Sequence, residues 1–197
     1  ALAVDADTGL DNPATAFRSR RSSPWPARLD VLQGLSGLLL GLFMWGHMVF
    51  VSSILVSKDL MWSVTRFFEG YFLFGTAYPA IVSVVVALVT LLFVLHAVLA
   101  LRKFPSSYEQ YHVLRVHRLQ LRHGDTTLWW VQVLTGFALF FLASPHLYQM
   151  LVHPGLIGPY GSADRVWSGG WWPLYLALLF CVELHGGIGL YRLALKW

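Results

Sequence analysis

The chain has 197 residues, of which 56% are hydrophobic and only 12% carry a charge. About a quarter of the residues in an average soluble domain are charged, so these values argue against an ordinary soluble protein and favour a membrane protein. The single cysteine, Cys181, excludes an internal disulfide, a Cys-x-x-Cys-His haem attachment site, a cysteine-rich zinc site and a self-contained iron–sulfur cluster. Any redox cofactor held by this chain alone must be bound mainly through nitrogen or oxygen.

Four apolar runs follow a polar beginning. Residues 1–25 lack the apolar stretch of a secretory signal, so we expect a loosely ordered tail before one membrane domain over residues 26–197. The runs are long enough to cross a hydrocarbon core about 30 Å thick and lack the alternation typical of barrel strands. The predicted fold class is therefore all-α, a transmembrane helical bundle with four visible spanning helices. These helices are predicted over residues 31–56, 79–101, 126–152 and 171–195.

Two connecting segments are too polar to cross the membrane. Residues 57–79 combine charges with many aromatic side chains, which predicts a segment lying at the membrane interface. Residues 102–125 are basic and polar, and Asp125 with Thr126 is expected to cap the third helix.

The Lys and Arg residues predict the orientation of the chain. Of these 14 residues, 11 lie before the first helix, between the second and third helices, or at the C-terminal end. Only Lys58, Arg66 and Arg165 lie on the other side. This positive-inside bias predicts a multi-pass protein with a cytoplasmic N-terminus, and it explains the basic residues without nucleic-acid binding.

Each predicted helix carries one histidine in or near its apolar stretch: His47, His96, His146 and His185. Ionisable residues within a membrane suggest a functional site, although an isolated His often only hydrogen-bonds a neighbouring helix. With a rise of about 1.5 Å per residue, His47 and His146 lie about 27–30 Å from the cytoplasmic side, and His96 and His185 about 9–15 Å from it. The four residues therefore form two pairs at different depths.

Two histidines at each of two depths are what two stacked bis-histidine haems b require. A porphyrin supplies four nitrogens and needs only axial ligands, whereas a small metal ion takes three or four ligands from one cluster. Two axial ligands saturate the iron, which favours electron transfer over oxygen activation. A proton relay, or an ion transporter that uses the histidines with Glu183, is the alternative.

Small and polar residues near the histidines suit a flat macrocycle. Gly37 and Gly41 make room for one, although close helix packing explains each glycine equally well. Gln33, Trp129 and Lys196 carry donors for haem propionates near the cytoplasmic ends of their helices, although Lys196 alone is more simply a positive-inside anchor.

Four stretches resemble the dihaem cytochrome b subunit of bacterial quinol:fumarate reductases, in the succinate:quinone oxidoreductase superfamily. They are PARLDVLQGLSGLLLGLFMWGHMVFVSSIL, HAVLALRKFP, RHGDTTLWWVQVLTGFALFFLASPHLY and PLYLALLFCVELHGGIGLYRLALKW. The resemblance implies an electron-transfer and quinol-oxidising subunit of an oxidoreductase complex in the bacterial inner membrane. Its expected partners are an iron–sulfur subunit and a flavoprotein that holds FAD and reduces fumarate, in an assembly that can form a dimer of heterotrimers.

The resemblance also implies which haem each histidine binds. His96 and His185 match the iron ligands of the inner, proximal haem b, and His47 and His146 match those of the outer, distal haem b. This is the same pairing that the depths of the four residues predict.

Five polar residues gain roles from the resemblance. Gln33, Trp129 and Lys196 match positions that hold propionates of the proximal haem. Glu69 matches the residue that takes a proton as menaquinol is oxidised, whereas the sequence alone favours a solvated surface Glu. Glu183, inside the fourth helix, matches a residue of a transmembrane proton path, and we expect it to be buried, where it stays protonated or transfers protons.

Two features depart from the family. Pro145 removes a backbone hydrogen bond just before His146 and is expected to disturb the third helix there. The family also has a fifth spanning helix, whereas this chain stops at Trp197.

The predicted function is electron transfer from menaquinol through two haems b to an iron–sulfur partner during fumarate reduction. The same architecture working as succinate dehydrogenase is the nearest alternative, because the sequence does not set the direction. Residues 102–125 are the predicted docking surface, and His112, His117 and His123 within them are expected to have surface or interface roles.

Overall fold

The computed structural model describes residues 23–121 and 124–197, and every regular element in these ranges is a helix. Four helices are long and apolar enough to cross a membrane, which confirms the predicted fold class. The N-terminal tail expected over residues 1–25 lies almost entirely outside the described residues, as does His123. The spanning helices are α2 (Trp25–Ser52), α5 (Pro79–Leu101), α7 (Gly124–Val152) and α9 (Trp172–Lys196).

Prolines and one hydroxyl mark where several helices begin. Proline occupies the first or second position of α2, α5 and α9, where its missing N–H removes no intrahelical bond. Ser57 caps α3 (Lys58–Phe68), because its Oγ accepts a hydrogen bond from the Leu60 N–H at 3.0 Å.

The predicted cap of α7 was wrong. This helix begins at Gly124, so Asp125 lies inside its first turn. The Asp125 carboxylate instead accepts a hydrogen bond from the Tyr191 hydroxyl of α9 at 3.1 Å. This hydrogen bond joins α7 to α9.

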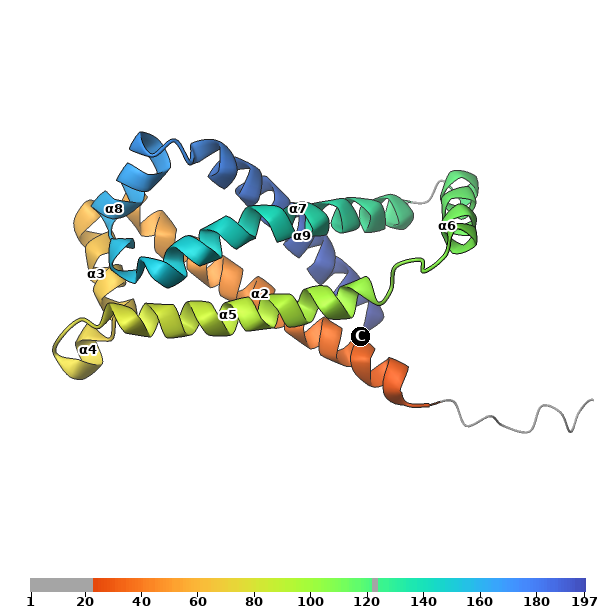
Figure 1. The fold of residues 1–197 in the computed structure, drawn as a ribbon, viewed down its shortest axis with the longest axis horizontal. Helices are drawn as coiled ribbons and strands as arrows, with labels where there is room; N and C mark the ends of the chain where they lie inside the picture. The colour runs from red at the N-terminus through yellow and green to blue at the C-terminus, as the bar shows by residue number, and fades with distance from the viewer. Residues whose placement is uncertain (1–22, 122–123) are drawn as a thin grey trace, which may run out of the picture.

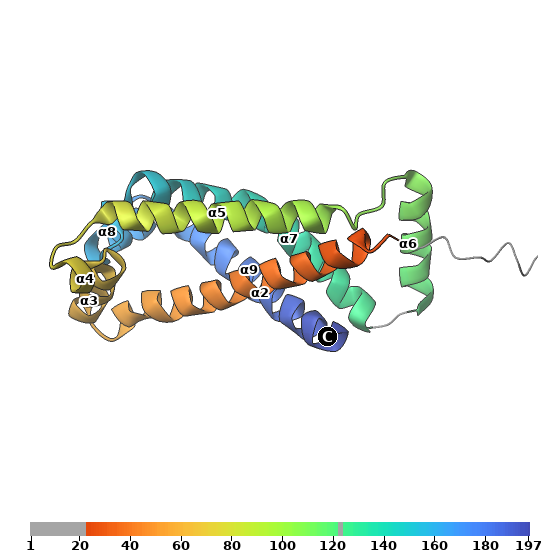
Figure 2. The ribbon, with the colours of Figure 1, turned by 90° about the horizontal axis from the view of Figure 1, so that it is seen from below.

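Short helices lie at the two ends of the bundle (Figures 1 and 2). At the end where α2 stops, α3 lies across the long helices beside α8 (Pro159–Ala163), and α4 (Tyr71–Phe74) lies on the other side of α3. At the other end, α6 (Tyr108–Leu121) lies across the bundle axis and stands clear of it. The remaining short elements are η1 (Ser53–Leu55), η2 (Pro154–Leu156) and η3 (Asp164–Ser168).

The long helices surround a space rather than a side-chain core. Among the described residues, the buried apolar side chains are only Met61, Leu99, Leu139, Met150 and Pro159. Protein interiors are normally packed as densely as organic crystals, with few voids larger than a water molecule. A bundle of this length with so few buried side chains leaves room between its helices for another group.

Candidate cofactor site

A large cavity lies between the four spanning helices. Its volume is about 1520 Å³, whereas a pocket for one small molecule is typically about 300–1,000 Å³. Apolar side chains from all four helices form most of its wall. The predicted site residues that also line it are His47, His96, His146, His185, Gln33, Trp129 and Lys196.

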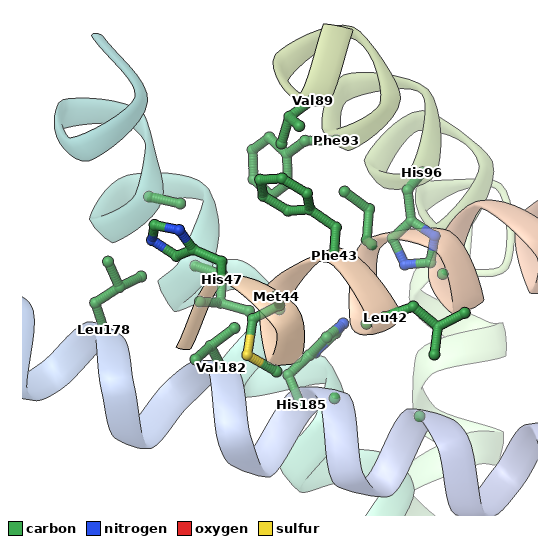
Figure 3. Close-up of a pocket in the computed structure, with 18 of the residues that line it drawn as sticks. Leu42, Phe43, Met44, His47, Val89, Phe93, His96, Leu178, Val182 and His185 are labelled. Atoms are coloured by element: carbon green, nitrogen blue, oxygen red, sulfur yellow. The ribbon is translucent and has the colours of Figure 1, made fainter. Parts of the chain in front are cut away.

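The histidines meet in the two pairs that their depths predict. The ring centroids of His47 and His146 are 6.2 Å apart, and those of His96 and His185 are 6.4 Å apart. Figure 3 shows the two levels, with His47 at one and the rings of His96 and His185 at the other. The thioether of Met44 lies between the levels, close to Val182 in the same view.

Both separations suit a single metal ion held between two imidazoles. A metal–nitrogen bond is about 2.0 Å long and a ring nitrogen lies about 1.1 Å from its centroid, so two opposed rings have centroids about 6.2 Å apart. The described residues contain no group of three or more His, Cys, Asp or Glu that would hold a metal ion by itself. A metal ion at either level therefore needs ligands in addition to the two imidazoles. A porphyrin supplies four such ligands to its iron.

Hydrogen bonds orient both rings of the inner pair. His96 Nδ1 lies 3.1 Å from the Ser36 hydroxyl, which in turn donates to the Gln33 carbonyl at 3.0 Å. His185 Nδ1 lies 2.8 Å from the Gln132 carbonyl, and because a carbonyl only accepts, this ring nitrogen is the donor. Metal-binding histidines commonly donate one ring N–H in this way, which leaves Nε2 for the metal.

Two glycines admit the rings of the inner pair. A Cβ at Gly37 would lie 2.9 Å from His96 Cε1, and a Cβ at Gly136 would lie 2.9 Å from His185 Cε1. Both distances are shorter than a Cβ tolerates, so a larger residue would displace the ring. Gly37 therefore leaves room for the His96 ring, and it also lines the cavity.

Side chains rather than backbone groups orient the outer pair. His146 Nδ1 lies 3.3 Å from the Tyr175 hydroxyl, which accepts a hydrogen bond from Arg165 Nε at 3.1 Å. The His47 ring lies parallel to the Phe43 ring, with an interplanar angle of 5°. The outer rings therefore depend on the conformations of neighbouring aromatic side chains.

Pro145 does not end α7, which continues through it to Val152. The expected loss of one backbone bond leaves His146 within 6.2 Å of His47, as measured between ring centroids. The disturbance predicted at this proline therefore does not separate the outer pair.

The three predicted propionate residues lie in the part of the cavity wall at the end with α6. Gln33 Oε1 is buried and has no hydrogen-bond partner. A buried amide oxygen without a donor is costly, so a group with a hydrogen-bond donor, such as a water molecule, would complete this part of the wall, while the Gln33 amide NH2 is the group that could donate to a propionate. Lys196 is about half exposed, and its Nζ lies 3.1 Å from Asp30 Oδ2.

Glu69 is buried, so the expectation of a solvated surface Glu was wrong. It is only 3% exposed, and its Oε2 lies 3.0 Å from Arg66 Nη1. The Arg66 guanidinium also lies over the Trp62 ring, 4.4 Å from its centroid. Thr65 and Phe68, which precede Glu69, line the outer end of the cavity. Two neighbours of this buried, cation-paired carboxylate therefore line the cavity, while Glu69 itself is not among the residues of the wall.

Glu183 is exposed in this chain rather than buried, and it is absent from the cavity wall. Successive residues of a helix are rotated by about 100°, so Glu183 and His185 point in nearly opposite directions. Because His185 faces the cavity, Glu183 lies on the outer face of α9. The chain itself therefore does not bury this carboxylate, and its burial within the membrane stays a prediction.

Several residues beside the histidines were missed from sequence. Ser36 and Gly136 contact the inner rings, and Tyr175 with Arg165 supports the outer pair. Ser36 and Gly136 each lie on a different helix from the ring that they contact. No spacing along the sequence therefore marks them.

Fold and site together define a class: a membrane protein of four spanning helices whose interior is lined by two facing pairs of histidines. Residues 108–197 match the model of the succinate dehydrogenase/fumarate reductase transmembrane subunit family. The chain is 54% identical over 188 residues to the fumarate reductase cytochrome b subunit of Wolinella succinogenes, a match that covers 95% of this chain and 73% of that protein.

A second relative is the fumarate reductase cytochrome b subunit of Helicobacter pylori strain J99. It is 57% identical over 182 residues, which cover 92% of this chain and 71% of that protein. The chain therefore belongs to the family of succinate dehydrogenase/fumarate reductase transmembrane subunits, and the predicted resemblance is confirmed. Membership implies haem binding and catalytic partner subunits.

Proposed function

We propose that this chain carries electrons from menaquinol to the iron–sulfur subunit of a fumarate reductase, with two haems b as carriers. His96 and His185 hold the proximal haem, and His47 and His146 hold the distal haem. A haem between two imidazoles gains and loses single electrons and has no open position for oxygen. The flavoprotein subunit, which holds FAD, then reduces fumarate to succinate.

One observation carries this proposal: two facing histidine pairs, with centroids 6.2 Å and 6.4 Å apart, line one cavity of about 1520 Å³. An ion site in a transporter needs several polar ligands at one level, whereas each level here offers two imidazoles in a mainly apolar wall. A proton relay requires a chain of titratable groups, and the wall between the two levels is mainly apolar. Fumarate reduction is preferred to succinate oxidation because both relatives described above are fumarate reductase subunits.

Two further groups of residues belong to the proposal. Gln33, Trp129 and Lys196 hold the propionates of the proximal haem, since their donors lie at its end of the cavity. Glu69 takes a proton from menaquinol as electrons leave it, since its carboxylate lies beside the outer end of the cavity. Glu183 belongs to a proton path on the outer face of α9.

The topology completes the proposal. The chain crosses the bacterial inner membrane with its N-terminus and residues 102–125 in the cytoplasm, as the distribution of Lys and Arg indicates. The iron–sulfur subunit docks against residues 102–125, where α6 stands clear of the bundle and exposes His112 and His117. The flavoprotein binds to the iron–sulfur subunit, and the heterotrimer forms a dimer.

Haem content tests the proposal directly. A pyridine haemochrome assay on the purified complex is expected to give two haems b for each copy of this chain. Iron and zinc are measured on the same sample. A preparation of folded complex with no haem, or with one metal ion other than iron at each level, would falsify the proposal.

The role of Glu69 needs its own variant. Glu69→Gln is expected to keep both haems and to lose menaquinol oxidation, because the amide cannot take the proton. Asp59→Asn is the control, since Asp59 is exposed in the first turn of α3. Oxidation of menaquinol by Glu69→Gln at the wild-type rate would reject the role.

A further inference from the structure

One carboxylate, Asp30, forms ion pairs with three cationic side chains at the inner end of the cavity. Asp30 Oδ1 lies 2.6 Å from Arg102 Nη2 and 3.4 Å from Lys103 Nζ, and Asp30 Oδ2 lies 3.1 Å from Lys196 Nζ. Asp30 belongs to the second turn of α2, Arg102 and Lys103 follow the end of α5, and Lys196 ends α9. We call these four residues the Asp30 cluster.

The Asp30 cluster has more positive than negative charge. One carboxylate with three cations leaves two positive charges, which is the number that the two propionates of one haem would neutralise. The side chains of the cluster are between 32% and 45% exposed, and ion pairs as exposed as these add little to the stability of a fold. Stability is therefore a weak explanation for three cations at one place.

The Asp30 cluster also lies on the side of the inner histidines. Asp30, Lys103 and Lys196 all line the cavity. Lys103 follows His96 by seven residues and lies just beyond the end of α5, and both residues line the cavity. Lys103 was not among the site residues expected from sequence.

We propose that Lys103 and Asp30 act as opposed charges that set the reduction potential of the proximal haem. Lys103 is a cationic partner of the propionates beside Lys196, and Asp30 positions the cations and offsets part of their charge. This inference rests on the proposed function, because it requires a haem between His96 and His185.

The sign of each effect follows from electrostatics. Reduction adds one negative charge to the haem, so a nearby cation stabilises the reduced form and a nearby carboxylate destabilises it. Removing the charge of Lys103 therefore lowers the potential, and removing the charge of Asp30 raises it.

Potentiometric titration of the purified complex, followed by the absorbance of each haem, tests the inference. Lys103→Gln is expected to shift the potential of the proximal haem downwards, and Asp30→Asn to shift it upwards. The Asp30→Asn/Lys103→Gln double variant is expected to return close to wild type, because the two changes oppose each other. The distal haem keeps its potential in all three variants.

Matched controls lie at the other end of the bundle. Lys58→Gln and Asp59→Asn make the same chemical changes in α3, and neither is expected to move the potential of the proximal haem. Asp30→Glu keeps the negative charge and is expected to keep the wild-type potential. If Asp30 had only a structural role, the potential would not follow the charge at this position.

Three outcomes would overturn the inference. They are unchanged proximal potentials in both single variants, shifts in the same direction in both, and equal shifts of both haems. In each case the complex still contains two haems, so the proposed function stands. A complex without haem in the wild type is the separate result that rejects the proposed function.

Discussion

The two histidine levels are built differently. At the inner level, His185 donates to a backbone carbonyl, His96 meets a hydroxyl that is itself bound to a backbone carbonyl, and each ring lies against a glycine. At the outer level, Tyr175 and Arg165 orient one ring and an aromatic side chain lies parallel to the other.

This difference predicts which substitutions disturb the orientation of each ring. Backbone groups within a helix move little, so the inner rings have fixed neighbours and little free space on the side that faces Gly37 and Gly136. The outer rings are supported by side chains that a single substitution can remove without affecting the helices. Steric changes should therefore act most strongly at the inner level, and electronic changes at the outer level.

The largest effect is expected from His96→Ala. This substitution removes one axial ligand of the inner level and should release the proximal haem while the distal haem remains. Reduced-minus-oxidised spectra and haem content per chain measure the outcome. Loss of only the distal spectrum would contradict the assignment of the pairs.

Gly136→Ala tests the tight fit of the inner level. The new methyl group would lie 2.9 Å from His185 Cε1, so the ring must move and the occupancy of the proximal haem should fall several-fold. Gly187→Ala in α9 is the matched control, because nothing lies within 4 Å of its added Cβ. Equal haem content in the two variants would show that the inner rings have free space after all.

Tyr175→Phe sharpens the contrast at the outer level. Without the hydroxyl, His146 Nδ1 loses its acceptor, the ring becomes a less basic ligand, and the potential of the distal haem should rise while both haems are retained. Redox titration measures the shift. Tyr148→Phe is the control, because Tyr148 is exposed on the same helix as His146. A shift of the proximal haem instead would reverse the comparison.

The smallest effect is expected from Ser36→Ala. It removes one hydrogen bond from His96, a loss of about 1 kcal/mol. The proximal haem should therefore be released at a slightly lower temperature, as followed by absorbance during heating. Ser63→Ala, at an exposed position of α3, should leave the release temperature unchanged. A loss of all haem from Ser36→Ala would mean that Ser36 does more than orient the ring.

Much of the fold follows from hydropathy alone. A hydrocarbon core of fixed thickness demands about 20 apolar residues for each span, so the four spans can be read from the sequence to within a few residues. The pairing of the histidines follows as well, because helix rise converts residue number into depth.

Burial of the two carboxylates was not predictable in this way. Glu69 follows a charged, amphipathic segment, yet the packing of α3 against the bundle leaves it 3% exposed. Glu183 lies in an apolar run, yet it points away from the cavity and is exposed. Sequence position gives depth in the membrane, whereas the rotation and packing of a helix decide which residues face the interior.

The sequence by itself determined the helices and the two levels of histidines, because these depend on hydropathy and on distances along one helix. Only the tertiary structure decided what surrounds each ring. Ser36, Gly136 and Tyr175 act on histidines of other helices, and such contacts depend on how the helices pack together, which no spacing along the chain encodes.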